Sequence, residues 1–313
     1  MSAETWSASA PSNIAIIKYM GKAPGNLPLN PSLSYTTPDC YSTVSITVDP
    51  EAIEDTWVAD DPDSPLLTAS ERARFLRHVQ LIKAHYGCEA HVVVRGKNNF
   101  PLGCGLASSA SSFAALTQAV SAACASLTDK TPASVQQMAQ WSRVASGSSC
   151  RSFYTPWSLW DGEQVSAVDL PLMRHMVVVV SADKKAVSSS QAHQRVLSSD
   201  VFMGRSNRAN KRLEAVLLAF DHGNWRQIFE LVWAEFWDMH ALFETANPSF
   251  GYMTPGSIAV LNLVRQYWRQ HNDGPLVTMD AGPNVHLLFR QDQQQHQKRL
   301  GAQLGAYQVL GDS

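Results

Sequence analysis

The chain has 313 residues, of which 45% are hydrophobic and 17% are charged, and its formal net charge is −2. This composition is ordinary for a globular protein and not for a disordered one, and the length suits about two domains. The near-neutral charge gives no electrostatic reason to expect nucleic acid or a membrane surface as a partner. Any anionic substrate would therefore have to be met by local cations.

The first six residues, MSAETW, lack the basic and apolar segments of a secretory signal peptide, so we expect none. The five cysteines are scattered without C-x-x-C spacing, and the histidines include no H-E-x-x-H motif. Such cysteines are typical of reduced thiols, and neither pattern supports a metal site built by the protein alone. We expect a cytoplasmic protein without a disulfide framework.

In the N-terminal half, alternating apolar residues predict strands, whereas apolar residues at helical spacing predict helices. An apolar strand within residues 10–22 leads to Lys18 and Lys22. The other predicted strands lie over residues 41–48, 90–95, 152–160 and 163–169, the last two forming a hairpin around Asp161-Gly162. The predicted helices lie over residues 70–86, with Ser70 as N-cap, and over 106–126 and 133–145.

The character of the chain changes after about residue 173. The predicted strands of this half cover residues 176–181, 274–279, 285–289 and 307–310. Long amphipathic helices are predicted over residues 199–221, 224–244 and 256–271, and a polar helix begins at 291. Strands and helices of both halves are expected to pack as mixed α+β layers.

Residues 101–113, PLGCGLASSASSF, form a loop of small residues that opens into a predicted helix. Gly103 and Gly105 would let the backbone approach a ligand, and the helix start offers unpaired N–H groups. The hydroxyls available to phosphate oxygens or Mg²⁺ belong to Ser108, Ser109, Ser111 and Ser112. A serine-capped helix packed on small residues explains the segment equally well. Neither the P-loop motif nor the dinucleotide fingerprint is present.

Four further polar clusters lie outside what a core needs, and one of them, LNPSLS at 29–34, is an otherwise unremarkable turn. Lys18 and Lys22 flank Tyr19 after the first strand, although lysines at a strand end are usually only solvated. The segment ASGSSCR at 145–151 offers hydroxyls beside a flexible glycine and ends in an arginine, which can hold a carboxylate or phosphate or form a structural ion pair. Asp280 ends a predicted strand, where a turn-forming aspartate is the default.

With these clusters in this order, the chain resembles the diphosphomevalonate decarboxylases of the galactokinase, homoserine kinase and mevalonate kinase superfamily. The matching strings span nearly the whole chain and lie at residues 10–22, 27–34, 98–110, 146–152, 184–189 and 280–284. The strings NNFP at 98–101 and DAGPN at 280–284 are the most specific. The glycine/serine loop alone marks only the superfamily.

The resemblance implies an α+β fold of two-layer sandwiches with the active site in the cleft between two parts. The N-terminal domain, 1–175, would resemble the second domain of a small-subunit ribosomal protein and carry the phosphate loop. The C-terminal domain, 176–313, would be ferredoxin-like and carry DAGPN. The implied reaction is the ATP- and Mg²⁺-dependent decarboxylation of mevalonate 5-diphosphate to isopentenyl diphosphate, with release of ADP, phosphate and CO₂. The resemblance also implies a homodimer.

The resemblance also implies roles for individual residues. Asp280 would orient or deprotonate the 3-hydroxyl, Arg151 would hold the substrate carboxylate, and Lys18 would support the reacting groups. The residues implied to hold the diphosphate are Tyr19, Lys22, Ser146 and Ser148. Those implied to contact ATP are Asn98 near the adenine, Gly103, Gly105, Ala107, Ser108 and Ser109 in the loop, and Lys185, Ser188 and Ser189, which would close over the phosphates. Ser108 and Ser109 are also the candidate Mg²⁺ ligands.

Two departures from the family pattern would lie beside the substrate. Met20 stands where the family usually has Trp, and His193 follows Ala192 where the family typically has Gly-Met. Pro31 and the Pro-Leu-Gly-Cys-Gly loop are also unusual. We expect His193 to donate to a substrate phosphate, more strongly once protonated below its usual pKa of about 6.5. Preference for the diphosphate over the monophosphate would then grow as the pH falls from about 8 to 6.

Three alternatives stay open on the sequence. The chain could be a related decarboxylase acting on mevalonate 5-phosphate, a mevalonate 3-kinase that does not decarboxylate, or a non-catalytic binding paralogue. The presence of both Asp280 and Arg151 favours decarboxylation, and Lys22 favours a substrate with a terminal phosphate. Candidates at every catalytic position weigh against a non-catalytic protein.

Overall fold

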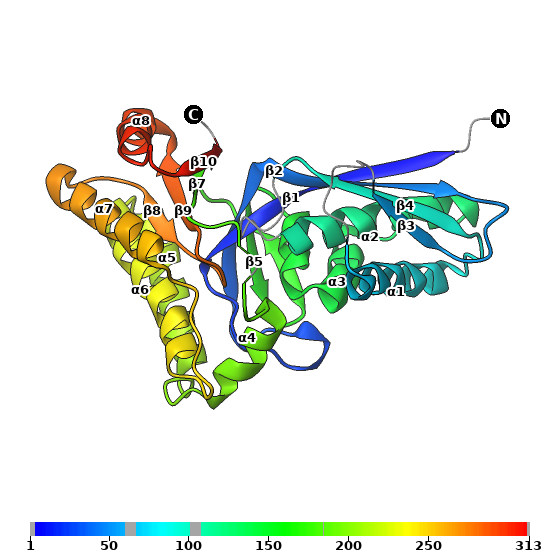
Figure 1. Cartoon of the computed structure of the whole chain (residues 1–313), viewed down its shortest axis with the longest axis horizontal. Coiled ribbons are helices and arrows are strands. Elements are labelled where there is room, and N and C mark those ends of the chain that lie inside the picture. Colours follow the sequence, from blue (N-terminus) through cyan, green and yellow to red (C-terminus); the bar gives the residue numbers. More distant parts are fainter. Residues whose placement is uncertain (1–3, 60–66, 101–107, 184, 312–313) are drawn as a thin grey trace.

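The computed structural model describes residues 4–59, 67–100, 108–183 and 185–311, which form two β-sheets with helices packed against them (Figure 1). The N-terminal elements are β1 (Thr5–Ile17), β2 (Ser32–Val48), β3 (Thr56–Ala59), α1 (Ala69–Tyr86), β4 (Val92–Asn98), α2 (Ser108–Leu127), α3 (Val135–Ala145), β5 (Trp157–Asp161) and β6 (Gln164–Ala167). The C-terminal elements are β7 (Met173–Val179), α4 (Ser189–Arg195), α5 (Arg205–Asp221), α6 (Trp225–Glu244), α7 (Pro255–His271), β8 (Leu276–Thr278), β9 (Val285–Arg290), α8 (Gln294–Gln303) and β10 (Gln308–Gly311). Short 3₁₀ segments lie at Pro24–Asn26, Gly147–Phe153, Val196–Ser198 and Gln291–Gln293.

The larger sheet is organised around the long strand β2. Its strands run in the order β3-β4-β2-β5-β6, and β1 pairs with β2 along most of its length. Helices α1, α2 and α3 lie on one face of this sheet (Figure 1). The core between them contains Ile46 and Val94 from the strands and Phe75 and Phe113 from the helices. This is one of the mixed α+β layers expected from the sequence.

Helix α2 is buried in this core because its residues are small and apolar. Its length and composition alone would suit a membrane span, but 72% of that window is buried inside the fold. Ala114 and Leu116 are among its fully buried residues. Its burial is that of a core helix.

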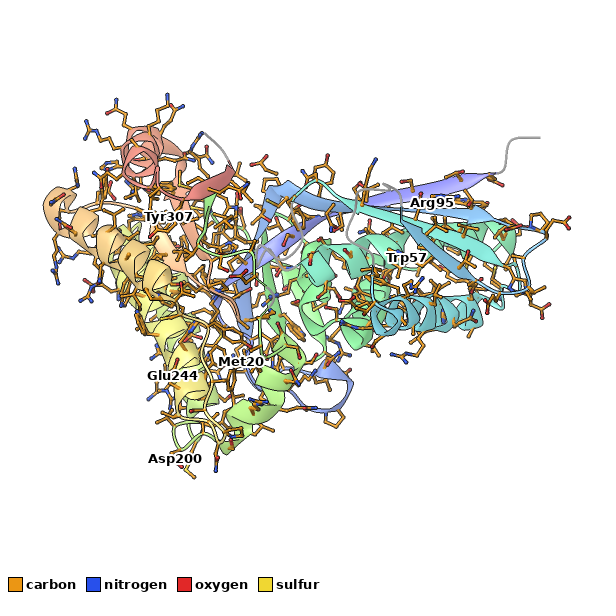
Figure 2. All side chains as sticks on the ribbon, in the orientation of Figure 1. Met20, Trp57, Arg95, Asp200, Glu244 and Tyr307 are labelled. Carbon is orange, nitrogen blue, oxygen red and sulfur yellow. The ribbon has the colours of Figure 1, made fainter. Side chains whose placement is uncertain are left out.

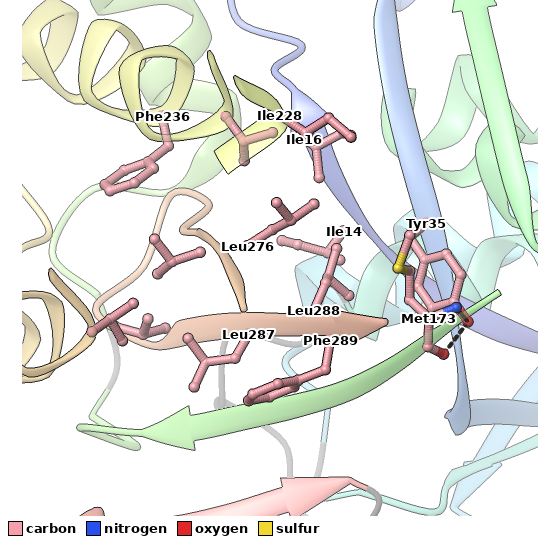
Figure 3. Packing of buried hydrophobic residues seen from close by; sticks show 14 of the residues in the cluster. Ile14, Ile16, Tyr35, Met173, Ile228, Phe236, Leu276, Leu287, Leu288 and Phe289 are labelled. Atoms are coloured by element: carbon pink, nitrogen blue, oxygen red, sulfur yellow. Dashed lines mark hydrogen bonds between the residues drawn. The ribbon is translucent and has the colours of Figure 1, made fainter. Parts of the chain in front are cut away.

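The smaller sheet has the strand order β10-β7-β9-β8. Strand β1 reaches into the core beside it: Figure 3 shows Ile14 and Ile16 next to Leu276 and Leu288, with Ile228 of α6 above them. All of these residues belong to one buried cluster. The strand that leads to Lys18 is therefore packed by both halves of the chain.

A second contact joins the halves at the beginning of β7. The Tyr35 hydroxyl donates to the carbonyl oxygen of Met173 at 2.6 Å, and the Met173 amide donates back to the hydroxyl at 3.2 Å (Figure 3). Since Tyr35 lies on β2, this pair fixes the first strand of the smaller sheet against the centre of the larger one.

Several predicted boundaries are wrong for local reasons. Helix α1 is capped by Thr68 and not by Ser70, because Thr68 and Glu71 form a reciprocal capping box. Residues 152–156 are not strand, since a 3₁₀ segment occupies Gly147–Phe153. Residues 199–204 are not part of α5, which begins after Gly204 at a φ of +77°. No local pattern predicted β3, α4 or the first parts of β1 and β2.

Candidate active site

A cavity of about 540 Å³ opens between the two halves, and most of the predicted site residues line it. Met20, labelled in Figure 2, lies at this junction. The cations of the lining are Lys18, Lys22, Arg74, Arg151 and Lys185, and its carboxylates are Asp183 and Asp280. Because cations outnumber carboxylates, the cavity suits a polyanionic ligand. The local cations that an anionic substrate of this near-neutral chain would need are therefore present in the cavity.

Lys18 and Asp280 form an ion pair at one wall of the cavity. Lys18 follows the end of β1 and Asp280 follows β8, and the Lys18 ammonium donates to Asp280 Oδ1 at 2.7 Å. The Lys18 side chain is 1% exposed, whereas that of Asp280 is 29% exposed and faces the cavity. Asp280 is thus held by a buried cation yet accessible to a ligand, which goes beyond the role of a turn residue.

The charges around Asp280 keep it ionised. Burial opposes ionisation, but the Lys18 ammonium and the Arg151 guanidinium outweigh burial and lower the pKa of Asp280 below its usual value. Burial lowers the pKa of Lys18, against the attraction of Asp280. At neutral pH the wall therefore presents a carboxylate whose negative charge is balanced by cations behind it.

Arg151 is buried beside this pair and is held by neutral groups. Its Nε donates to Asn13 Oδ1 at 3.0 Å, and its Nη1 donates to Ser32 Oγ at 3.3 Å. It forms no salt bridge with any described residue, so the structural ion pair considered from the sequence is wrong within that part of the chain. A buried guanidinium lining a cavity without a paired acid is well placed to receive a ligand carboxylate.

A second group of polar side chains surrounds Lys22. The Lys22 ammonium donates to Asn26 Oδ1 at 2.9 Å, and the Tyr19 hydroxyl donates to the Asn26 carbonyl at 3.1 Å. The hydroxyl of Ser146 lies 3.2 Å from that of Ser109. Ser148 also lines the cavity. The structure thus brings together all four residues expected at the diphosphate, with the phosphate-loop helix beside them.

His193 lies at the same end but does not gain a proton as expected. The Gly21 amide donates to His193 Nδ1 at 3.1 Å, so the neutral ring carries its proton on Nε2. Burial, followed by the charges of Lys22 and Arg151, lowers the pKa of His193 to about 3. The predicted protonation between pH 8 and 6 is wrong for the ligand-free protein, because the ring is enclosed and already accepts a backbone hydrogen bond.

The residues expected at ATP are only partly described. Gly103, Gly105 and Ala107 lie outside the described residues. Ser108 and Ser109, at the start of α2, line the cavity. Lys185, Ser188 and Ser189 line the same cavity.

Several of the ATP candidates also have structural partners. Lys185 donates to Ser189 Oγ at 3.0 Å and to the Ala281 carbonyl at 2.8 Å. Ser188 caps α4, accepting from the Gln191 amide. Asn98 does not line the cavity; its Oδ1 accepts from Ser42 and Ser112, so its contact with adenine stays a prediction.

A magnesium ion would have to be held largely by its nucleotide. The described residues contain no group of three His, Cys, Asp or Glu side chains arranged for a metal. The hydroxyls of Ser108 and Ser109 are hard oxygen donors at a helix start, which suits Mg²⁺ that arrives bound to phosphates.

Several residues of the site were not predicted from the sequence. Arg74, on α1, lines the cavity and donates to the Ala145 carbonyl through Nε and Nη2 at 3.2 and 2.7 Å. Its guanidinium also lies over the Phe113 ring. Asn13 and Asn26 hold Arg151 and Lys22. No local motif marks Arg74, but Asn13 lies inside the matching string 10–22 and could have been singled out.

This cavity, with a serine-rich helix start and a carboxylate backed by cations, has the features of enzymes that transfer a phosphoryl group from ATP to a small acid. Residues 10–168 match the model of the diphosphomevalonate decarboxylase-like N-terminal domain, and residues 175–305 match that of the mevalonate 5-diphosphate decarboxylase C-terminal domain. The chain belongs to the diphosphomevalonate decarboxylase family.

Individual relatives agree with this assignment. A curated diphosphomevalonate decarboxylase from Saccharomyces cerevisiae is 31% identical over 320 residues, covering 92% of this chain and 78% of the relative. A mevalonate diphosphate decarboxylase crystal structure from Legionella pneumophila is 43% identical with a TM-score of 0.93, covering 98% of this chain and 100% of that one. The structure of MDDEF in complex with MVAPP, AMPPCP and magnesium is 28% identical with a TM-score of 0.85, covering 96% and 93%. The predicted fold class is confirmed.

Proposed function

We propose that this protein catalyses the reaction for which its family is named, the ATP-dependent conversion of mevalonate 5-diphosphate to isopentenyl diphosphate, ADP, phosphate and CO₂. The observation that carries the proposal is the ionised, cavity-facing Asp280, held at 2.7 Å by Lys18 with Arg151 buried beside it. This arrangement offers a group for a hydroxyl and a group for a carboxylate in one cavity. A substrate that carries both on neighbouring carbons fits that requirement.

In the first step the substrate 3-hydroxyl attacks the γ-phosphorus of ATP, and ADP leaves. Asp280 orients the hydroxyl and accepts its proton as the new O–P bond forms. Its lowered pKa makes it a weak base, which suits a loose transition state in which the proton moves late. Lys18 stabilises the negative charge that gathers on the transferred group.

In the second step the 3-phosphate leaves with the C–O electron pair, and the electron pair of the C–CO₂ bond forms the alkene. Arg151 holds the carboxylate so that this bond stays aligned with the leaving phosphate. Asp280 releases the proton it accepted in the first step, which its lowered pKa favours, and the regenerated carboxylate stabilises positive charge on the substrate carbon. Because Asn13 and Ser32 fix the guanidinium, Arg151 need not move between the two steps.

The diphosphate is assigned to the group around Lys22. Tyr19, Ser146 and Ser148 offer hydroxyls, and His193 offers a neutral Nε2–H. Arg74 adds a second cation at this end, since it lines the cavity near Lys22, whose pKa burial and Arg74 together lower. A diphosphate uses more of these donors than a monophosphate does, which supports the diphosphate as the preferred substrate.

ATP is assigned to the side of the cavity formed by the start of α2 and by α4. Ser108 and Ser109 would contact its phosphates, and Lys185, Ser188 and Ser189, which line the same cavity, would close over them. Mg²⁺ bound to those phosphates would neutralise charge on the transferred group. The MDDEF structure holds MVAPP, AMPPCP and magnesium together, which supports a site that binds both ligands at once.

Measurement of ADP release and CO₂ trapping with mevalonate, its 5-phosphate and its 5-diphosphate tests the proposal. We expect ADP and CO₂ in equal amounts, fastest with the diphosphate. ADP without CO₂ would instead identify a 3-kinase, and faster reaction of the monophosphate would identify the related decarboxylase. Nucleotide binding without any turnover would identify a non-catalytic paralogue.

We further propose a cytoplasmic homodimer whose chain divides near residue 175 into the two domains expected from the sequence. The four cysteines among the described residues are buried and free, as in a reducing compartment. Strand β7, which begins at Met173, opens the second sheet. Light scattering of the purified protein tests the dimer, and fractionation of its native cells tests the location.

A further inference from the structure

The peptide groups on either side of Lys18 Cα are held by residues far away in the sequence. The Lys18 amide donates to Glu235 Oε1 at 3.0 Å, and the Lys18 carbonyl accepts from Arg205 Nη2 at 3.1 Å. Asn30 Nδ2 donates to the same carbonyl at 2.9 Å. Lys18 directly follows Ile17, the last residue of β1, so these side chains replace the strand partners that the backbone has just lost.

Glu235 and Arg205 belong to a charge cluster between α5 and α6, made up of Arg205, Arg208, Arg212, Glu235 and Asp238. Arg205 contacts both oxygens of Glu235, which is fully buried. Arg212 donates to Glu235 Oε2 at 2.9 Å and to Asp238 Oδ2 at 2.5 Å. Arg208 contacts only Asp238 among these acids, at 2.8 Å. The carboxylate that receives the Lys18 amide is therefore itself fixed by two arginines.

The packing of α5 against α6 does not require this cluster. The two helices already bury apolar residues such as Val216, Ile228 and Val232 in the main core. A buried ion pair is often no more stabilising than apolar residues of similar volume, because both charges lose their water. What the cluster supplies that apolar residues would not is an acceptor and a donor for the Lys18 backbone.

We propose that Glu235 and Arg205 are positioning residues, which fix the Lys18 backbone so that its ammonium meets Asp280 and the reacting groups. The inference rests on the proposed function, since it assigns Lys18 to the transition state. The Lys18 side chain extends from a backbone that is fixed at both its amide and its carbonyl, and its ammonium lies 2.7 Å from Asp280 Oδ1. Misplacing a reacting group by about 1 Å can slow an enzyme by about 10²-fold.

The test compares Arg205→Lys with Arg208→Lys. Both changes keep a positive charge in the cluster, but Arg205 contacts Glu235 and Lys18, whereas the acid that Arg208 contacts is Asp238. A lysine at 205 cannot span the Glu235 carboxylate and the Lys18 carbonyl with a planar fork. We expect Arg205→Lys to lower kcat by about 10-fold or more, with dissociation constants for mevalonate 5-diphosphate and an ATP analogue within twofold of wild type. Arg208→Lys should keep kcat within twofold, even if its Tm falls as much as that of Arg205→Lys.

A second variant, Asn30→Ser, removes the other donor to the Lys18 carbonyl and leaves every ion pair of the cluster in place. We expect a smaller loss of kcat, about threefold to tenfold, again without weaker binding. It decides the question alone if Arg205→Lys is not recovered folded. The proposal is overturned if Arg205→Lys and Asn30→Ser both keep kcat within twofold, or if Arg208→Lys loses as much kcat as Arg205→Lys. An inactive wild-type protein would instead refute the proposed function, and this inference with it.

Discussion

The side chain of Tyr19 lies directly against Gly147, in the turn that follows α3. A Cβ atom at Gly147 would lie 2.7 Å from Tyr19 Oη and 2.9 Å from Tyr19 Cε1, both closer than van der Waals contact allows. The Ser-Gly-Ser segment therefore needs a glycine for the space that Tyr19 occupies.

Gly147→Ala should displace the Tyr19 ring and weaken binding of mevalonate 5-diphosphate by about tenfold, the loss of one or two hydrogen bonds. ATP-analogue affinity should stay within twofold, because Tyr19 is assigned to the other ligand. Calorimetric titration with each ligand measures both. Gly301→Ala, whose new Cβ would make only ordinary contact with Met176, is the control. Unchanged substrate affinity in Gly147→Ala would remove Tyr19 from the diphosphate site.

Asp280→Asn should reduce kcat by at least about 10³-fold, because the proton acceptor and its negative charge are both lost. Binding of an ATP analogue should hardly change. Asp183→Asn alters the other carboxylate of the cavity, which accepts from Ser181 Oγ, and should keep kcat within a few-fold. Steady-state assays of both variants decide the matter: an Asp280→Asn enzyme with more than a tenth of the wild-type kcat would reduce Asp280 to a turn residue.

Ser109→Ala should weaken nucleotide binding or slow phosphoryl transfer while leaving substrate affinity near normal, since its hydroxyl is assigned to the ATP phosphates. The 3.2 Å contact with Ser146 allows a small effect on the substrate. The control is Ser112→Ala, one turn along α2, because the hydroxyl that it removes contacts Ser42 and does not line the cavity. If Ser109→Ala weakens the binding of ATP analogue and substrate equally, the start of the helix is misfolded.

His193→Met should lower kcat/KM for the diphosphate to a similar extent at every pH between 6 and 8. The ring stays neutral in this range, because its pKa is lowered to about 3 and its Nδ1 accepts from Gly21. Only the Nε2–H donor is lost. Wild type and variant should therefore show the same pH trend in the ratio of kcat/KM for diphosphate and monophosphate. A trend that is present in wild type and absent in His193→Met would restore the protonated imidazole predicted from the sequence.

Buried histidines should make the fold sensitive to acid. Burial lowers the pKa of His78 and His286 to about 4 and that of His193 and His240 to about 3, against about 6.5 in the unfolded chain. Below about pH 6.5 the unfolded state binds more protons than the folded state, so the free energy of unfolding falls as the pH decreases toward these lowered values. Each histidine contributes up to about 1.4 kcal/mol per pH unit.

Urea unfolding at pH 7, 6 and 5 measures this dependence, with His222→Gln as the control. His222 is 65% exposed, so His222→Gln should leave the pH dependence of the free energy of unfolding unchanged. His78→Gln should reduce that dependence by the contribution of one buried histidine. A midpoint that is the same at pH 7 and pH 5 would show that these side chains take up protons without unfolding.

Local sequence patterns predicted those elements whose packing in the fold agrees with the apolar spacing of their own residues. The helix at 224–244 and the strand at 285–289 have strong apolar periodicity and lie within a residue or so of α6 and β9. The 17-residue strand β2 was only half predicted, because its first part pairs with β5 and is buried on both faces. Buried residues there include Ser32 and Ser34, which carry no strand signal of their own.

The residues of the site likewise divide into those that a local motif marks and those whose role comes only from contacts in the fold. Lys18, Arg151 and Asp280 could be found because each lies in a short motif with a family resemblance. Arg74 and Glu235 could not, since each is one charged residue on a helix and acquires its role only from contacts across the fold. The neutral state of His193 likewise depends on the Gly21 amide and on burial, neither of which a sequence displays.

Strand β1 has a consequence for any attempt to cut the protein into pieces. Ile14, Ile16 and Ile17 are buried in the same cluster as Leu287 and Phe289, although the rest of β1 belongs to the larger sheet. A fragment ending near residue 175 would leave this apolar surface open to water and would lose Glu235 and Arg205, two of the partners of the Lys18 backbone. Such a fragment would be aggregation-prone, so engineering by domain exchange would have to carry β1 together with the helices that cover it.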